Sequence, residues 1–134
     1  MAIAMILSER GTCDRKQVGA VIVRDGRCVS WGYNGAPPGA PHCDENDHGW
    51  AGMAEPYGIG CRNATHAEAN ALAFAAKQGI STDDGTLYVT VAPCDNCSRL
   101  LIAAGISNVY YHEEYRDRTG LEVLERALIP TQCV

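Results

Sequence analysis

Two short motifs, far apart in the sequence, most constrain how this chain can fold, because together they carry a set of metal-ligating side chains. The first is His66-Ala67-Glu68, and the second is Pro93-Cys94-Asp95-Asn96-Cys97. Each is expected at the beginning of a helix. Cys94 and Cys97 are three residues apart, so on a helix both thiolates face the same way, in the first turn, where the helix dipole favours anionic sulfur.

The histidine and the two cysteines of these motifs could supply three of the four ligands of a tetrahedral metal site. A zinc ion held by His66, Cys94 and Cys97 would keep its fourth position for water, which is the arrangement of catalytic zinc sites. Glu68 lies close enough in sequence to move protons for such a water without binding the metal. H-x-E followed by P-C-x-x-C is similar to the signature of zinc-dependent nucleobase deaminases. The motifs therefore predict a zinc enzyme whose general acid and base is Glu68.

Two simpler interpretations compete with this one. Thr65 and Glu68 also form a capping box, in which Glu68 would only satisfy backbone donors of a helix. A C-x-x-C pair on its own can be a redox pair. The two motifs occur together with the expected spacing and order, which favours the zinc site.

The composition is that of one globular domain, residues 1–134, because 46% hydrophobic residues suffice for a full core. No apolar run reaches about 18 residues, so no membrane span is expected. The first residues, MAIAMILSERGT, lack a basic region and a cleavage site, and are expected to form an amphipathic helix rather than a signal peptide. The seven cysteines, two of them assigned to metal, favour the reducing cytoplasm, or the host cytoplasm for a viral protein.

The charge of the chain argues against a nucleic-acid partner. Its formal net charge is −5, whereas binding a polynucleotide requires a basic stripe. A small nucleotide remains compatible with this charge, because a few local lysines or arginines suffice for one phosphate.

The expected elements alternate between strands and helices over most of the chain. A helix over 2–10 is followed by an antiparallel hairpin, 18–24 and 27–33, joined at Asp25-Gly26. The later part is expected to contain helices at 65–78, 94–104 and 118–127 and strands at 86–91, 108–112 and 129–134. This order predicts an α/β fold with a largely parallel sheet covered on both faces and an antiparallel edge.

The loop at about 35–63 is rich in glycine and proline and has no periodicity. Loops of this length inside a compact domain are often functional or held by another group. The sequence suggests a second, structural zinc, with Cys13, His42, Cys43 and Cys61 as ligands and His48 as the alternate. The alternative is that these are free thiols and a surface histidine.

With these residues in view, the chain resembles the deoxycytidylate (dCMP) deaminases of the cytidine deaminase-like zinc-dependent superfamily. The zinc motifs are common to that superfamily, whereas Gly32-Tyr33-Asn34-Gly35 narrows the likeness to the dCMP branch. The likeness covers nearly the whole chain, and its other segments are Gln17-Val18-Gly19-Ala20-Val21-Ile22-Val23, HAEANA at 66–71, Thr86-Leu87-Tyr88-Val89-Thr90 and Ala104-Gly105-Ile106.

The resemblance implies a three-layer α/β/α sandwich around a central mixed five-stranded sheet, usually assembled as a homohexamer. It implies zinc-dependent hydrolysis of dCMP to dUMP and ammonia, a step toward dTMP. Glu68 would take a proton from the zinc-activated water, deliver it to N3 of cytosine and help ammonia leave. In many hexameric relatives dCTP activates and dTTP inhibits, so these nucleotides are expected effectors.

Further residues are candidates for binding the substrate. The backbone N–H of Ala67, at a helix start, is free to donate to the carbonyl oxygen of the base. In relatives the asparagine at the position of Asn34 bonds the sugar hydroxyl, although Asn-Gly is also a turn dipeptide. Tyr115 is a candidate for stacking on the base or bonding the phosphate. The candidates for phosphate, effector or subunit contacts are cations that are otherwise solvated surface charges: Arg15, Lys16, Arg116, Arg118 and Lys77.

Three rival functions remain open at this stage. The first is deamination of another substrate: a free base, a nucleoside, tRNA adenosine or a 5-substituted dCMP. The second is a non-catalytic nucleotide-binding module on the same fold, against which the intact Glu68 argues. The third is a zinc-stapled redox or structural module, which leaves His66-Ala67-Glu68 unexplained.

Overall fold

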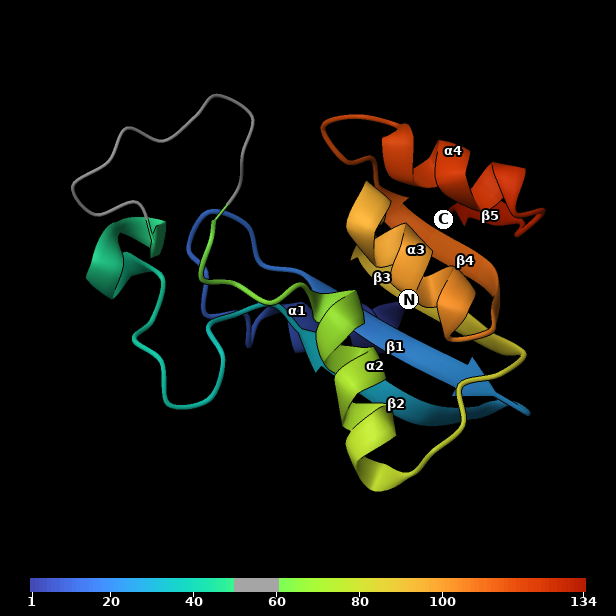
Figure 1. Ribbon diagram of the computed structural model, residues 1–134, viewed down its shortest axis with the longest axis horizontal. Coiled ribbons are helices and arrows are strands. Elements are labelled where there is room, and N and C mark those ends of the chain that lie inside the picture. Colours follow the sequence, from blue (N-terminus) through green and yellow to red (C-terminus); the bar gives the residue numbers. More distant parts are fainter. Residues whose placement is uncertain (50–60) are drawn as a thin grey trace.

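A mixed sheet of five strands forms the centre of the structure, a computed structural model that describes residues 1–49 and 61–134 (Figure 1). The strands are β1 (Gly19–Arg24), β2 (Arg27–Tyr33), β3 (Gly85–Val91), β4 (Ile106–Glu113) and β5 (Thr131–Cys133). Their order across the sheet is β2-β1-β3-β4-β5. β1 runs antiparallel to both β2 and β3, whereas β3, β4 and β5 are parallel. The expected mixed sheet with an antiparallel edge is confirmed.

Helices cover both faces of this sheet. The helices are α1 (Ala2–Ser8), α2 (Ala67–Gln78), α3 (Asp95–Ala103) and α4 (Thr119–Arg126), with a 3-10 helix, η1 (Asp44–Gly49). In Figure 1, α2, α3 and α4 lie in front of the sheet and α1 lies behind it. The α/β/α arrangement that the sequence predicted is therefore confirmed.

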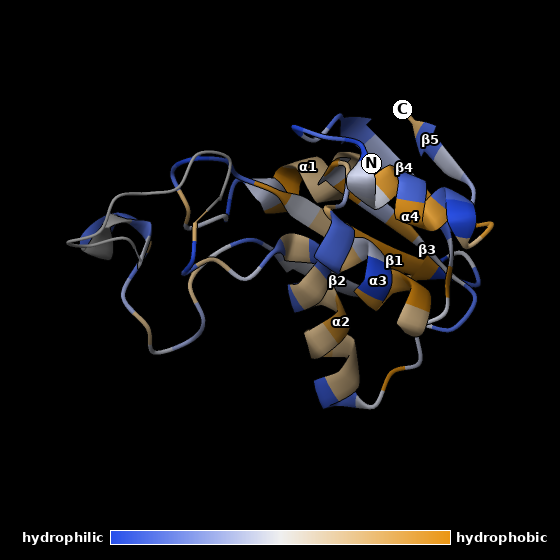
Figure 2. Ribbon diagram, turned by 45° about the horizontal axis from the view of Figure 1, so that its top comes forward, coloured by the Kyte–Doolittle hydropathy of each residue, from blue (hydrophilic) through white to orange (hydrophobic). Residues whose placement is uncertain are grey.

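The core lies between the sheet and the three helices on its front face. Alternate residues of the inner strands point into it, because successive side chains of a strand face opposite sides. Figure 2 shows hydrophobic residues concentrated on β1 and β3, between the helices. The helices contribute Leu101 from α3 and Leu124 from α4, both fully buried. The strand residues of this core that are at most 1% exposed are Ala20, Ile22, Leu87, Val89 and Val109.

The local signals for turns and caps correspond to the structure. Asp25 and Gly26 both have positive φ, 52° and 70°, as the two central residues of a tight type I′ hairpin turn require. Gly79 ends α2 in the left-handed conformation, with φ at 67°, which is the common glycine cap of a helix.

The long loop that follows β2 contains local structure that the sequence did not predict. Residues 44–49 form the 3-10 helix η1, and Gly35 forms an antiparallel bridge with Thr65. This bridge keeps Thr65 extended, so α2 begins at Ala67 rather than at residue 65. Residues 50–60 of the predicted loop lie outside the described residues. Within the described ranges, none of the helices is long and apolar enough to cross a membrane.

Two adjacent leucines of α3 allow the core to be tested. Leu101 is 0% exposed, whereas Leu100 is 49% exposed. Leu101→Ala is expected to lower the free energy of unfolding by about 2–5 kcal/mol, because it removes buried apolar contacts and leaves a cavity. Leu100→Ala, the matched control, is expected to change it by at most about 0.5 kcal/mol. Urea denaturation followed by circular dichroism measures both, and equal losses would contradict this assignment of the core.

Candidate active site

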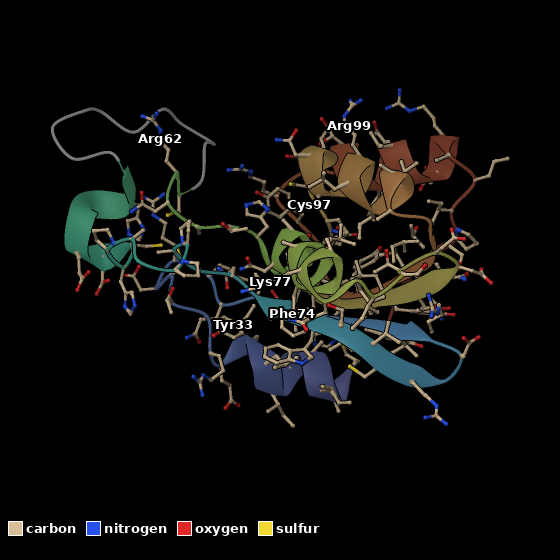
Figure 3. The ribbon with its side chains drawn as sticks, turned by 60° about the horizontal axis from the view of Figure 1, so that its bottom comes forward. Tyr33, Arg62, Phe74, Lys77, Cys97 and Arg99 are labelled. Carbon is tan, nitrogen blue, oxygen red and sulfur yellow. The ribbon has the colours of Figure 1, made fainter. Side chains whose placement is uncertain are left out.

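The two sequence motifs meet where α2 and α3 begin. His66 is the residue before α2, and Cys94 is the residue before α3. The sulfur of Cys94 lies 3.5 Å from Nδ1 of His66, and the sulfur of Cys97 lies 3.4 Å from the same nitrogen. Figure 3 shows Cys97 between α2 and α3. The structure therefore brings together the three ligands that the sequence predicted.

The spacing of these three atoms fits a zinc ion. Tetrahedral bonds of about 2.3 Å to sulfur and about 2.0 Å to nitrogen place two ligand atoms roughly 3.5 Å apart. All three ligand atoms lie within 4.8 Å of one another. The hydrogen bond from the Cys97 thiol, followed by that from His66, lowers the pKa of Cys94 to about 4. One sulfur is therefore in the thiolate form that binds zinc, while the shared hydrogen bond and burial raise the pKa of Cys97.

Glu68 lies in the first turn of α2 and is buried. Burial raises the pKa of its carboxyl to about 7, because water no longer stabilises the charged form. The capping-box interpretation is wrong, because the N-cap of α2 is His66, without a side-chain cap bond. Thr65 instead exchanges two backbone hydrogen bonds with Gly35, of 2.9 and 3.1 Å. The Glu68 carboxyl is thus left for the site, and its side chain lines the pocket beside the ligand set.

A pocket of about 300 Å³ opens above these residues. His66, Glu68 and Cys94 line it together with the first residue of α2, Ala67. Val18, Ala64, Val91 and Ala92 supply apolar walls. The other polar or charged residues that line it are Arg15, Lys16, Asn34, Glu114, Tyr115 and Arg116. A small organic ring fits such a partly apolar cavity with a few polar groups.

Asn34, a predicted sugar-binding residue, lies in this pocket wall and is buried. Its amide nitrogen donates to the carbonyl oxygen of Lys16 at 2.6 Å, and its amide oxygen accepts from the backbone N–H of Val18 at 2.7 Å. The alternative of a simple Asn-Gly turn is wrong, because Gly35 pairs with Thr65 in the antiparallel bridge.

The predicted cations divide into two groups. Arg15, Lys16 and Arg116 line the pocket. The Arg116 guanidinium lies 5.1 Å from the centre of the Tyr115 ring, which also lines the pocket. Lys16 forms an exposed ion pair with Glu113 at the end of β4.

The other two predicted cations lie outside the pocket lining. Arg118 is paired with Glu114 and Glu125, at 3.3 and 3.7 Å. Lys77 is in the last turn of α2, at the opposite end of that helix from His66, and lies near Phe74 in Figure 3. This position argues against a contact between Lys77 and a phosphate in the pocket.

Glu113 and Glu114 are residues of the site region that sequence reasoning missed. Both lie at the C-terminal edge of the parallel part of the sheet, where β4 ends. Ligands of open α/β sheets bind at this edge. The position of Glu114, directly before Tyr115, could therefore have indicated from the sequence that it belongs to the site.

A second group of ligand atoms lies beside the pocket. The sulfur atoms of Cys13, Cys43 and Cys61 and a ring nitrogen of His48 lie within 4.8 Å of one another. We call these four residues the Cys3His cluster. The sequence had placed His42 in this set with His48 as the alternate, and His42 is the wrong member.

Local geometry explains this correction. The backbone N–H of His42 donates to the carboxylate of Glu45 at 2.8 Å, and His42 is exposed. Helix η1 then turns the chain back, so that the N–H of His48 donates to the carbonyl oxygen of Cys43 at 2.7 Å. Nδ1 of His48 lies 3.8 Å from the sulfur of Cys13, and its Nε2 lies 3.3 Å from a carboxylate oxygen of Asp14. A histidine with one nitrogen toward a ligand cluster and the other toward a carboxylate is typical of metal sites.

The fold and the first ligand set define a class of protein, zinc-binding α/β proteins with a buried glutamate beside the metal ligands. Residues 1–113 match the family described as the cytidine and deoxycytidylate deaminase zinc-binding region. The chain belongs to this family, and the resemblance noted in the sequence is confirmed.

Individual relatives agree with the family assignment. The chain is 40% identical over 119 residues to the deoxycytidylate deaminase of Mycobacterium phage D29, an alignment that covers 85% of this chain and 91% of that protein. It is 40% identical over 135 residues to ComE operon protein 2 of Bacillus subtilis, covering 100% of this chain and 68% of that protein. The crystal structure of the dCMP deaminase from cyanophage S-TIM5 in complex with dCMP and dUMP superposes with a TM-score of 0.84 at 33% identity, over 99% of this chain and 92% of that one.

Proposed function

We propose that this protein hydrolyses dCMP to dUMP and ammonia with zinc as its cofactor. The observation that carries the proposal is the pocket in which the His66, Cys94 and Cys97 ligand set adjoins the buried Glu68. Support for the nucleotide comes from the similarity to the S-TIM5 enzyme, whose structure holds dCMP and dUMP. Of the rival substrates, tRNA fits least well, because the net charge of the chain is −5.

The chemistry requires one proton carrier close to the reacting carbon. Bound by its three ligands, zinc supplies an activated water as the nucleophile for C4 of cytosine. Glu68 accepts a proton from that water and gives it to N3 of the ring. It then passes the remaining proton of the new C4 hydroxyl to the amino group, which leaves as ammonia as the C4–N bond breaks, so one carboxyl acts as both base and acid. A pKa of about 7 for Glu68, raised by burial, suits both tasks near neutral pH.

Other residues of the pocket hold the nucleotide. The N–H of Ala67 is the first of α2 and has no acceptor within the helix, so it is free to donate to the carbonyl oxygen of the base. In this proposal Asn34 bonds the sugar hydroxyl and Tyr115 flanks the base, which agrees with their positions in the pocket wall. Arg15, Lys16 and Arg116 supply positive charge for the phosphate, and Lys16 exchanges its exposed partner Glu113 for the phosphate in this scheme.

The proposal predicts both the preferred substrate and the effect of changing Glu68. Ammonia release is expected to be faster from dCMP than from deoxycytidine or cytosine, because only dCMP carries the phosphate. Glu68→Gln is expected to lower the rate with dCMP at least about a hundredfold, in line with general acid–base contributions, while zinc content stays at the wild-type value. A coupled assay of ammonia and zinc analysis measure both quantities.

The control for this variant is Glu122→Gln, which changes an exposed carboxylate on α4. It is expected to keep the wild-type rate. Equal rates on all three substrates would contradict the dCMP assignment, and a near-normal rate of Glu68→Gln would contradict the role of Glu68.

We also propose that the Cys3His cluster binds a second, structural zinc. Three thiols and an imidazole are the ligands of a closed zinc site. Burial, and then the neighbouring Cys61 thiol, raise the pKa of Cys43 to about 12. A cation bound among these thiols would instead lower their pKa values, because it stabilises the thiolate form.

A pair of histidine variants tests the second zinc and its ligand set. The wild type is expected to hold two zinc ions per chain and His48→Ala one. His42→Ala is the matched control and is expected to keep both. The His48 variant is also expected to melt at a lower temperature, because structural zinc contributes folding free energy. Elemental analysis and calorimetry measure these quantities, and one zinc per chain in the fully loaded wild type would refute the proposal.

We further propose that the active form is a homo-oligomer, a hexamer as is usual in the family, regulated by dCTP and dTTP. Helix α2 carries small apolar residues around much of its surface, and Figure 2 colours it moderately hydrophobic along most of its length. Its Phe74 stacks on Trp31 of β2 with ring centres 5.7 Å apart, yet the two side chains are 40% and 43% exposed. A subunit contact would cover them.

Sedimentation and kinetics test this assembly. The wild type is expected to sediment well above its monomer mass, and its dCMP saturation curve to be sigmoidal and become hyperbolic with dCTP. Phe74→Asp is expected to lower the sedimentation coefficient, because a charge in a buried contact is costly. Leu128→Asp, at a residue 90% exposed elsewhere on the chain, is the control. A monomeric wild type would refute the assembly, and hyperbolic kinetics that do not respond to dCTP would refute the regulation.

We infer the reducing cytoplasm as the compartment. All seven cysteines are free thiols in the structure, and five of their sulfur atoms lie in potential metal-ligand sets. Free thiols and metal ligands of this kind are typical of reducing compartments.

A further inference from the structure

The Cys3His cluster and the active-site pocket share a wall. Cys13 and Cys61 contribute their sulfur atoms to the cluster, and both residues also line the pocket. Cys43 and His48, the other two members, are not among the residues that line it. A structural change at the cluster can therefore alter the pocket wall through Cys13 and Cys61 without moving the catalytic ligands.

The connection through Cys13 leads to the pocket cations. Residues 12–18, which we call the 12–18 segment, have no regular secondary structure. The segment carries Cys13 into the cluster, and Arg15 and Lys16 into the pocket wall. Between them, Asp14 points its carboxylate at Nε2 of His48, at 3.3 Å. The cluster therefore holds the two residues that directly precede Arg15.

Asn34 and Glu113 anchor the remainder of the segment. The carbonyl oxygen of Asn34 accepts from the N–H of Thr12 at 3.0 Å. The side chain of Asn34 bonds the backbone of Lys16 and Val18, at 2.6 and 2.7 Å. Glu113 holds the Lys16 ammonium in an exposed ion pair. The cluster and Asn34 thus hold the residues on either side of Arg15.

We propose that cation binding by the Cys3His cluster sets the affinity of the pocket for the phosphate group of a nucleotide, by fixing the 12–18 segment. The inference rests on the proposed function and on the second zinc proposed with it. Without the cation, weaker contacts hold the segment to the cluster, such as 3.8 Å between Sγ of Cys13 and Nδ1 of His48 and 3.3 Å between the Asp14 carboxylate and Nε2 of His48. The segment then gains conformational freedom, and ordering it again lowers the affinity for the ligand that it contacts. The cost is expected to fall on phosphate binding rather than on the base, because Arg15 and Lys16 are the charged residues that the segment contributes to the pocket wall.

Calorimetric titration with the product tests this coupling without turnover. The zinc-loaded wild type and Cys43→Ser are each titrated with dUMP and with deoxyuridine, which lacks the phosphate. Cys43 is the ligand to change because it is buried in the cluster and does not line the pocket. Cys28→Ser, at an exposed free cysteine of β2, is the matched control. Elemental analysis gives the zinc content of each protein.

The expected result is selective for the phosphate. Cys43→Ser should hold one zinc fewer than the wild type and bind dUMP about tenfold more weakly, the equivalent of about one charge-assisted hydrogen bond. Its affinity for deoxyuridine should change by less than about twofold, and Cys28→Ser should match the wild type in all respects. Zinc loss with unchanged dUMP affinity would overturn the proposal. An equal loss for both ligands would also overturn it, since that would show general disorder of the pocket.

A milder variant keeps the test decisive if Cys43→Ser does not fold. Asp14→Asn retains all four ligand atoms and removes only the charged partner of His48, which is expected to weaken zinc binding about 10–100-fold. The dUMP affinity of this variant, measured against free zinc concentration, should reach the wild-type value at a correspondingly higher zinc concentration. A dUMP affinity independent of zinc in this range would overturn the coupling. A wild type with a single zinc would refute the second site, and one that binds neither ligand would refute the proposed function itself.

Discussion

The active site depends on two helices that begin beside each other at one edge of the sheet. The first N–H groups of a helix lack acceptors within it and carry partial positive charge. At the starts of α2 and α3 this charge favours a thiolate on Cys94 and offsets part of the cost of placing ionisable groups in a buried site. Two glycines allow neighbouring elements to pack closely against these helix starts, Gly32 of β2 against α2 and Gly120 of α4 against the residues before α3. A Cβ on Gly32 would lie 2.4 Å from the carbonyl oxygen of Ala67, and one on Gly120 would lie 2.0 Å from that of Pro93.

The sequence was sufficient for the fold and for the ligands that meet at these helix starts, because both follow from local rules. Alternation of strands and helices determined the layers, and Asp25-Gly26 and Gly79 adopt the positive φ angles that their types favour. The spacing of Cys94 and Cys97 places both on one side of a helix turn. His66 could be predicted as the third ligand because the combination of H-x-E with P-C-x-x-C is a specific signature. The first residue of α2 was less predictable, because a bridge to distant Gly35 decides the conformation of Thr65.

The histidine of the Cys3His cluster could not be predicted from the sequence alone. His42 and His48 both lie near Cys43 in the sequence, and spacing alone does not separate them. The choice depends on how η1 turns the chain, and that turn is fixed by hydrogen bonds such as the one from His48 to Cys43. Local side-chain bonds, such as the one that Glu45 accepts from His42, compete with regular structure in short loops. The pairing of Lys16 with Glu113 is equally non-local, since it joins a loop to the end of β4.

Asn34 illustrates how one side chain can serve both structure and binding. A primary amide offers two N–H donors and an oxygen with two lone pairs. The structure uses one donor for Lys16 and one lone pair for Val18, which leaves one donor and one lone pair for a sugar hydroxyl in the pocket. A hydroxyl both donates and accepts, so it matches what remains. An aspartate would keep the bond to Val18 but lose both donors, and an alanine would lose both side-chain bonds and keep only the backbone bonds of this residue to Thr12 and Val18. The bonds to Lys16 and Val18 thus already favour asparagine over the acidic and the smaller side chain, and a sugar hydroxyl would use the donor and the lone pair that remain.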